Sequence, residues 1–481
     1  SSATMNDIAQ HMLDTYGYTA GTYNSITFPT TQEQFLVKLN GNINDNHSAE
    51  LIYQVTEDSF YSNYDSSAQP VFSNNYYEIP PETERVTVNI YSDWTDRFST
   101  RIRFSDRFFE QDANSGDGGY GGLFPEFHIY EGGEIIYVGS DRYRGHNLIE
   151  VDQQLMSIKG NLDLDTHYIT FGYETDSSSI YNSFINRYTG EINFGSLADF
   201  YAGNHNRVET FAVSVDAGGP FSLVRDDPNL PAARFDIDET IMYIQDEWQV
   251  NDNLSLTFGV RHYDFDIPQQ ALLNTSYESK FGFRNNATVS YTITQPRFAF
   301  DMDVSDTLFG DSSKVVAASL TGGYGLFHGR LPKVFFSNGF GRSSVDSFYS
   351  RFLSCAGPIP NLNSGATTGV TDPRFFWYRS DASTCATKGA SSNWYGYTHG
   401  TDPNFEGPST WRGNVKLDML TASGYDISVE FNRDIVRKDV DFKDYGYEVD
   451  GVLADGRPIT DSNENTYITN TSHGGGYSIT T

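Results

Sequence analysis

The sequence lacks any uninterrupted run of about 20 apolar residues, the length that a helix needs to cross a membrane. It has only two cysteines in 481 residues, which excludes a disulfide-rich scaffold and any zinc site built from four thiolates. Basic residues are scarce, with 32 Lys and Arg against 63 Asp and Glu and a net charge of −31. A chain with this charge repels nucleic acid phosphates, so we expect no nucleic-acid partner.

Aromatic residues, in contrast, are abundant: the chain contains 5 Trp, 32 Tyr and 35 Phe, although all hydrophobic residues reach only 38%. A disordered acidic chain would lack these aromatics. The dominant pattern is an alternation of apolar and polar residues with period two, which predicts strands that have one apolar and one polar face. The pattern is regular over 98–105, 411–419 and 425–432. A helical pattern is persuasive only over a short piece at 5–14.

The predicted strands are paired around short polar turns and separated by much longer connections. Clusters of Asn, Asp, Ser, Thr and Gly suit tight reversals. We place these reversals at 44–46, 95–96, 163–165, 251–253, 305–312 and 421–424. The long connections are expected at 58–82, 107–148, 175–235, 267–293 and 328–408. Because short turns and long connections alternate, all long connections fall at one end of the strands.

This asymmetry is typical of an outer-membrane β-barrel, which has short periplasmic turns and long extracellular loops. We count twelve strands of about 9–14 residues, long enough to span a membrane, with 438–449 and the C-terminal end as further candidates. A soluble β-sandwich or propeller would also alternate, but with shorter and more even loops. In the barrel, residues of one parity face lipid, and the opposite parity lines the lumen. The expected lumen-facing residues are Arg101, Arg103, Arg412, Lys416, Asp418, Asp426 and Glu430.

Four segments carry a resemblance to a known family. The most specific is DEWQVNDNLSLTFGVRHYD at 246–264, and the supporting ones are GGYGLFHGRLPKVFFSN at 322–338, INDNHS at 43–48 and YGYTAGTY at 16–23. Together they resemble TonB-dependent outer-membrane receptors, and more narrowly the Oar-like group. In that group a carboxypeptidase-regulatory-like domain and a plug precede a large barrel. The resemblance extends from about residue 16 to the end of the chain.

The resemblance implies a barrel of about 22 strands, a plug that fills it, and ligand import driven by the inner-membrane TonB complex. The sequence departs from this pattern because nothing before residue 16 provides a plug or a TonB-binding segment, and twelve strands are too few for a plugged lumen. We therefore expect a fragment of a receptor. Residues 1–30 would be a lead-in or plug-to-barrel connection, and 31–481 would be barrel strands and loops. Trp248, Tyr243 and Phe258 suit an aromatic girdle at the membrane interface.

Cys355 and Cys385 lie in the longest connection and are expected to form a disulfide. Closing a loop of about 30 residues would stabilise it by roughly 3–4 kcal/mol in the chain-entropy model, and the oxidising exterior permits the bond. The aromatic run Phe375, Phe376, Trp377 and Tyr378 offers anchors for ligand contact, or alternatively only packs within the loop.

Metal and catalytic signals are weak. Asp112, Asn114 and Asp117 could hold calcium, since oxygen ligands clustered among glycines suit that ion. Their spacing nevertheless fails the EF-hand pattern, and a solvated loop is the simpler interpretation. No metal-binding motif involves the ten histidines, and no nucleophile elbow appears. We expect no cofactor and no catalytic residue.

The sequence therefore predicts a non-enzymatic outer-membrane receptor or transporter whose loops are extracellular. Its expected partners are outer-membrane lipid and lipopolysaccharide, periplasmic TonB through a plug, and an external peptide, glycan or chelate. Two alternatives remain: a secreted β-rich adhesin or glycan-binding protein, and a polysaccharide-degrading enzyme of β architecture.

Overall fold

The structure is a computed structural model. It describes residues 1–480 except for 25, 64–69, 117–123, 188–189, 205–206, 214–231, 311–313, 342, 344–346, 354–392, 396–397, 445–448, 453–457 and 461–475.

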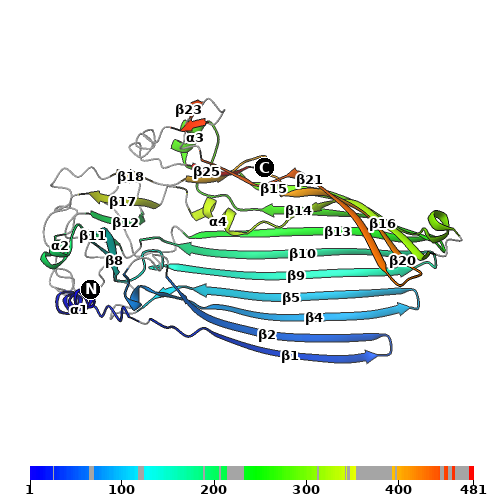
Figure 1. Ribbon diagram of the computed structural model, residues 1–481, viewed down its shortest axis with the longest axis horizontal. Helices are drawn as coiled ribbons and strands as arrows, with labels where there is room; N and C mark the ends of the chain where they lie inside the picture. The colour runs from blue at the N-terminus through cyan, green and yellow to red at the C-terminus, as the bar shows by residue number, and fades with distance from the viewer. Residues whose placement is uncertain are drawn as a thin grey trace.

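Twelve long strands form one continuous antiparallel sheet in the described part of the chain (Figure 1). Each strand pairs with its neighbour in sequence among these twelve, so the sheet is a meander. The strands are β1 (Thr31–Asn44), β2 (His47–Ser62), β4 (Pro81–Thr95), β5 (Phe98–Asp112), β9 (Asn147–Asp163), β10 (His167–Phe184), β13 (Ala233–Asn251), β14 (Leu254–Ile267), β15 (Val289–Asp303), β16 (Val315–His328), β20 (Ser409–Thr421) and β21 (Asp426–Lys438). The shortest have 13 residues and the longest has 19.

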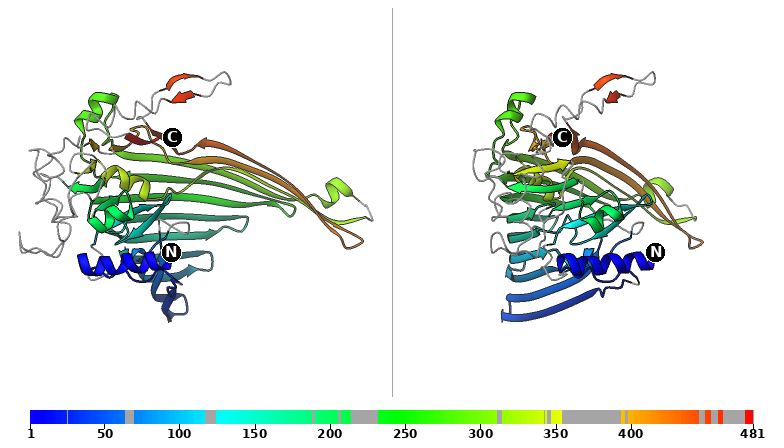
Figure 2. Two further views of the ribbon diagram at one scale, coloured as in Figure 1. Left: turned by 60° about the vertical axis from the view of Figure 1, so that its left-hand side comes forward. Right: turned by 90° about the vertical axis from the view of Figure 1, so that its left-hand side faces the viewer.

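The connections alternate in length as the sequence predicted. All six predicted reversals join successive long strands, and the five predicted long connections lie at the opposite end (Figure 1). The strands extend further into these connections than expected. In the turned views the sheet bends, and β20 and β21 curve away from the first strands (Figure 2). The predicted fold class is confirmed in its all-β antiparallel sheet with the long connections at one end of the strands.

The further strand candidates do not extend this sheet. In the described residues β25 (Gly476–Thr480) pairs with β22 (Asp441–Asp444) on one side and with β19 (Thr398–Thr401) on the other. A two-stranded ribbon, β23 (Val449–Val452) and β24 (Pro458–Thr460), follows β22 in the chain. Short strands β3 (Tyr77–Ile79) and β6 (Asn114–Ser115) extend the large sheet at the long-connection end.

The large sheet has two distinct faces, which we name by what covers them. Helix α4 (Val334–Gly341) packs on one face at the long-connection end, where Phe340 stacks on Phe235 with ring centroids 4.7 Å apart. We call this the inner face and the opposite one the outer face. Cross-strand pairing fixes which residues share a face. The described helices also include α3 (Thr275–Phe281), a 3₁₀ turn (Ser73–Asn75) and a π-helical turn (Ser305–Phe309).

The long connections fold together into a second unit, which we call the cap. A six-stranded sheet has the order β18 (Asn393–Tyr395), β17 (Ser347–Leu353), β12 (Arg207–Val213), β11 (Glu191–Phe194), β7 (Glu126–Glu131) and β8 (Glu134–Val138). Helix α1 (Ser2–His11), the π-helical turn Met12–Tyr16 and α2 (Leu197–Ala202) complete it.

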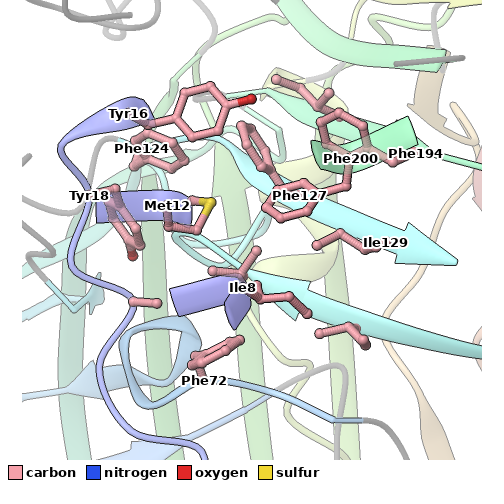
Figure 3. Packing of buried hydrophobic residues seen from close by; sticks show 14 of the residues in the cluster. Ile8, Met12, Tyr16, Tyr18, Phe72, Phe124, Phe127, Ile129, Phe194 and Phe200 are labelled. Atoms are coloured by element: carbon pink, nitrogen blue, oxygen red, sulfur yellow. The ribbon is translucent and has the colours of Figure 1, made fainter. Parts of the chain in front are cut away.

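The cap has its own hydrophobic core, drawn from four separate segments of the chain (Figure 3). Ile8 and Met12 are fully buried, and Tyr16 meets Phe127 edge to face at 5.3 Å. Tyr18 stacks on Phe124 with centroids 4.2 Å apart. Burying such side chains stabilises a fold by about 1.5–3 kcal/mol each, so the cap is a packed unit rather than a set of independent loops.

The start of the chain lies in the cap. The expected boundary at residue 30 coincides with the start of β1 at Thr31. Residues 5–20 nevertheless pack at the long-connection end of the large sheet, and the chain enters β1 from that end (Figure 1). The assignment of residues 1–30 as a lead-in or plug-to-barrel connection stays a prediction.

The β7–β8 hairpin depends on two glycines with left-handed backbone, Gly132 at φ 63° and Gly133 at φ 88°. A residue with a Cβ resists this conformation, at a cost of roughly 1–2 kcal/mol. Gly133→Ala should therefore destabilise the cap by about 1 kcal/mol, because no atom lies within 4 Å of the new Cβ and only backbone strain acts. Hydrogen exchange of the β7 and β8 amides measures this. Gly41→Ala in β1, equally open but outside the left-handed region, is the control and should have no such effect.

Candidate ligand-binding site

The inner face carries all seven residues that the sequence assigned to a lumen. In β5, Arg101 and Arg103 share this face with Ser105 and Arg107 because they have the same parity. Arg412, Lys416 and Asp418 occupy the same face of β20, opposite Asp434, Glu430 and Ser428 of β21, and Asp426 continues this row. The seven do not form one site: β5 and the β20–β21 pair lie far apart in the strand order. Their contact with a closed lumen stays a prediction.

The residues on β20 and β21 are paired with each other. Lys416 Nζ lies 2.9 Å from Asp418 Oδ2, and Arg412 Nε lies 3.7 Å from Asp434 Oδ2. Near the short turns, Asp418 and Asp426 border a shallow hollow with Asp301 and Asp303. On β5, Arg101 donates a hydrogen bond to Asn89 Oδ1 at 3.1 Å. Arg103, in contrast, borders a cavity that lies toward the long-connection end of the inner face, beside α4.

This cavity, of about 450 Å³, lies between the inner face and the segment that leads into α4. We call it the inner cavity. Its cationic lining consists of Arg85, Arg103, Arg107, Arg330 and Lys333. Two carboxylates, Asp176 and Glu239, also line it. A second part of the wall is aromatic, and Phe265 stacks on Tyr291 with centroids 4.8 Å apart.

Strand pairing explains why these cations converge. Arg85 of β4 lies directly opposite Arg107 of β5, and Arg107 lies opposite Gln153 of β9. Lys333 precedes α4 and donates a hydrogen bond to Ser178 Oγ of β10 at 2.6 Å. Burial lowers the pKa of Lys333, and Arg330 and Arg107 lower it further, although Asp176 and Glu239 act in the opposite direction.

The two carboxylates of the cavity are held by uncharged partners. Gln153 Nε2 donates to both oxygens of Asp176, at 2.8 and 2.9 Å. The Tyr263 hydroxyl donates to Glu239 Oε1 at 3.0 Å. None of the five cations forms an ion pair with a carboxylate of the described residues: no carboxylate oxygen there lies within 4.0 Å of their side-chain nitrogens.

Sequence reasoning missed most of this cavity. Arg85 and Arg107 continue the polar parity of β4 and β5, so the alternation that identified Arg103 could have found them. Arg330 and Lys333 lie in a connection, where no periodicity places them. Tyr243, expected in an aromatic girdle, lies on the inner face with Arg261 over its ring at 5.7 Å. Its odd parity separates it from Trp248 and Phe258, which share the outer face.

A second charged cluster is buried in the cap. His128 Nε2 lies 2.7 Å from Glu126 Oε2, and His128 Nδ1 lies 3.5 Å from Glu191 Oε1. Arg187 Nε and Arg142 Nη1 lie 2.8 and 3.3 Å from Glu191 Oε2. All three of the acidic and imidazole side chains are almost completely inaccessible to solvent. We call these five residues the cap ion network.

Glu126, His128 and Glu191 have ligand atoms close enough to surround a metal ion, within 4.8 Å of one another. Their carboxylates already face two guanidinium groups, which compensate their charge. The arrangement therefore fits a structural ion network better than a metal centre. Burial alone would raise the pKa of Glu191, but the charges of His128, Arg187 and Arg142 outweigh burial and hold that pKa well below its usual range.

The structure says little about the remaining predicted site residues. Cys355, Cys385, Phe375, Phe376, Trp377 and Tyr378 lie outside the described residues, as does Asp117. Asp112 ends β5, and the Asn114 side chain donates to the backbone carbonyl of Asp112 at 3.0 Å. The disulfide, the loop anchors and the weak calcium site stay predictions.

No protein-family model matches the chain, and no curated protein matches it in sequence. Solved structures do match. The outer membrane transporter YddB from Escherichia coli aligns with a TM-score of 0.50 and 12% identity, over 94% of this chain and 43% of that one. The ferric-catecholate import receptor Fiu from the same organism aligns with a TM-score of 0.44 and 10% identity, over 92% and 55%.

The FrpB iron transporter from Neisseria meningitidis aligns with a TM-score of 0.43 and 10% identity, over 85% of this chain and 46% of that one. The chain thus spans about half the length of these structures. At 12% identity the likeness to YddB concerns the fold alone, and it supports the outer-membrane β-barrel class. Among the described residues, no helix is long and apolar enough to cross a membrane.

Proposed function

We propose that this chain forms wall and loops of an outer-membrane receptor that binds an external ligand and admits it with TonB-coupled energy. The observation that carries the proposal is an apolar band on the outer face. Every one of the twelve long strands contributes a large, solvent-exposed apolar or aromatic side chain to this band. Examples, in strand order, are Leu39, Leu51, Ile90, Phe104, Ile158, Phe171, Ile244, Phe258, Phe298, Tyr324, Val415 and Val429.

A contiguous band of this extent argues against a protein that stays in water. Soluble monomers rarely expose apolar patches larger than a few hundred Å². Toward the short turns the inner face of the same strands is polar and charged, which is the reverse of a soluble sheet that packs its apolar face inward. Beside the long connections the inner face packs a buried apolar cluster against α4. A barrel wall in lipid has this polarity. Our main alternative, a secreted adhesin, does not explain why the outer face exposes this apolar band.

The limits of the band match the thickness of a membrane. On the outer face of β13, Asp238 lies toward the long connections and Trp248 toward the short turn, with Met242 and Ile244 between them. Asp246, next to Trp248 on this face, is paired with His167 at 2.8 Å. Roughly nine residues separate Asp238 from Trp248, and a tilted spanning strand needs about 9–11. Trp248 stacks on His167 at 5.5 Å and suits the interface. The long connections and the cap would then be extracellular.

The two edges of the sheet support a larger assembly. In the described part of the chain, β1 pairs only with β2 and β21 only with β20. Unpaired backbone groups are costly in lipid, where only closed barrels and helices satisfy them. We propose that further strands close the wall around a plug, as the family resemblance implies. The structural neighbour YddB is an outer membrane transporter, which agrees with the proposed class.

Fractionation of cells that express the full-length protein tests the membrane part of this proposal. We expect the protein in the outer-membrane fraction, soluble only in detergent, and with a gel mobility that changes on heating. Recovery as a soluble protein without detergent would favour the adhesin, and release of reducing ends from a polysaccharide would favour the enzyme.

A binding assay tests the energy coupling separately. The purified periplasmic domain of TonB should bind the detergent-solubilised full-length protein. Absence of that binding would remove TonB coupling from the proposal and leave an uncoupled receptor.

A further inference from the structure

The inner cavity gathers positive charge in a strongly acidic protein. Five of the 32 Lys and Arg residues line this one space, while the whole chain carries a charge of −31. Chance would surround most cations with carboxylates in such a chain. In this cavity the cations outnumber the two carboxylates, and those two are held by Gln153 and Tyr263 instead.

The arrangement is unfavourable without a counter-charge. Arg85 and Arg107 are directly opposite each other on neighbouring strands, a position in which like charges repel. The Nε atoms of Arg103 and Arg107 are buried and have no hydrogen-bond partner in the described part of the chain. A buried donor without a partner has lost its hydrogen bonds to water and gained none in return, which is unfavourable. A bound anion would supply both the missing charge and the missing acceptors.

The rest of the wall indicates what accompanies the anion. Phe265, Tyr291 and Phe336 present aromatic surface to the cavity, and Phe265 and Phe336 lie 5.5 Å apart between centroids. Ile237 and Val151 add aliphatic surface. A volume of about 450 Å³ falls in the usual range of small-molecule sites, about 300–1,000 Å³. The cavity thus combines a polycationic side with a flat apolar side.

We propose that the inner cavity binds an organic oxyanion with at least two negative charges attached to a planar apolar group. This inference rests on the proposed receptor function and gives the chemical class of its ligand. Guanidinium groups pair with phosphate and carboxylate oxygens through two parallel hydrogen bonds, so phosphate esters and aromatic dicarboxylates share the required chemistry.

Calorimetric titration of the detergent-solubilised full-length protein tests the proposal with four probes. Phenyl phosphate and phthalate represent the two oxyanion sources on a ring, and inorganic phosphate and benzoate each lack one of the two required features. We expect phenyl phosphate or phthalate to bind at least ten times more tightly than phosphate and benzoate. Whichever of phenyl phosphate and phthalate binds more tightly shows whether the ligand carries a phosphate ester or carboxylates. Binding should weaken as salt rises.

Two variants locate the binding in the cavity. Arg107→Gln and Arg330→Gln should each weaken binding about tenfold, because each removes charge-assisted hydrogen bonds. Arg330 lies outside the strands, so its substitution spares the sheet. Arg412→Gln is the matched control: it removes the same charge from the same face, outside the cavity and beside Asp434. It should leave binding unchanged.

Several outcomes would overturn the proposal. The first is that neither phenyl phosphate nor phthalate binds, and the second is that Arg412→Gln weakens binding as much as the cavity variants do. The third is that Arg107→Gln lowers the stability of the protein while no anion binds, which would mean that acidic side chains of another segment fill the cavity. The proposed function fails in a different way. If the protein is not recovered in the outer-membrane fraction, the proposed receptor function is wrong whether or not the anion binds. If the protein stays there and no anion binds, only the ligand class is wrong.

Discussion

Replacing Ile244 by arginine is expected to destabilise the inserted protein by about 2–4 kcal/mol, the cost of a basic side chain on the lipid face near the middle of a membrane. Ile244 lies on the outer face of β13, is 51% exposed, and is flanked across the strands by Phe171 and Val260. In the proposed receptor its side chain would therefore have lipid rather than protein around it. Urea unfolding of the full-length protein in lipid vesicles measures the change.

The neighbouring residue provides a matched control. Gln245 is one position further along β13 and so lies on the inner face, opposite Gly259 and Thr170. Gln245→Arg introduces the same charge at nearly the same depth, yet it should cost less than about 1 kcal/mol. Equal effects of the two substitutions would mean that β13 does not separate lipid from a polar interior.

The second large effect concerns the cap. Glu191→Gln should destabilise the cap by about 3–5 kcal/mol, because removing one partner of a buried ion pair leaves the others uncompensated. Arg187 and Arg142 lie 2.8 and 3.3 Å from the same carboxylate oxygen, and His128 lies 3.5 Å from the other. Hydrogen exchange and limited proteolysis of the segment 124–138 report on the cap, while the long strands should stay protected.

Glu134→Gln is the control, since Glu134 is exposed at the β7–β8 turn. It makes the same chemical change and should leave the cap unaltered. If the Glu191 variant protects the segment 124–138 as well as the unaltered protein does, the cap ion network contributes no stability.

The network also predicts a pH dependence. The pKa of Glu191 is lowered in the folded cap relative to its ordinary value of 4.5. A lowered carboxyl pKa stabilises the fold fully above the ordinary value, and this stabilisation is lost as the pH falls toward the lowered value. The cap should therefore loosen below about pH 4.5, and Glu191→Gln should lack this part of the dependence.

The sequence predicted the large sheet well because its signal is local. Alternation along each strand assigns a face to every residue, and clusters such as Asn251–Asn253 or Thr421–Gly424 end the strands with turn-forming residues. The seven expected lumen residues share the inner face for this reason. The error at Tyr243 has the same origin: we grouped it with Trp248 by proximity in the hairpin rather than by parity.

The cap and the inner cavity depend on contacts that no local pattern encodes. Glu126 and His128 alternate on β7, so a common face could be inferred, but their partner Glu191 reaches them through a parallel pairing of β11 with β7. The core around Phe127 joins the start of the chain to three long connections. Arg330 and Lys333 meet the β4–β5 arginines only because α4 folds over the sheet.

Site-directed spin labelling along β14 tests the central claim most directly. Single cysteines at positions 256–261, in full-length protein with Cys355 and Cys385 replaced by serine, would carry the label in lipid vesicles. The account predicts that labels at 256, 258 and 260 are relaxed by oxygen dissolved in lipid, whereas labels at 257, 259 and 261 are relaxed by a water-soluble nickel reagent. The opposite phase, or no alternation at all, would contradict a sheet whose outer face meets the membrane.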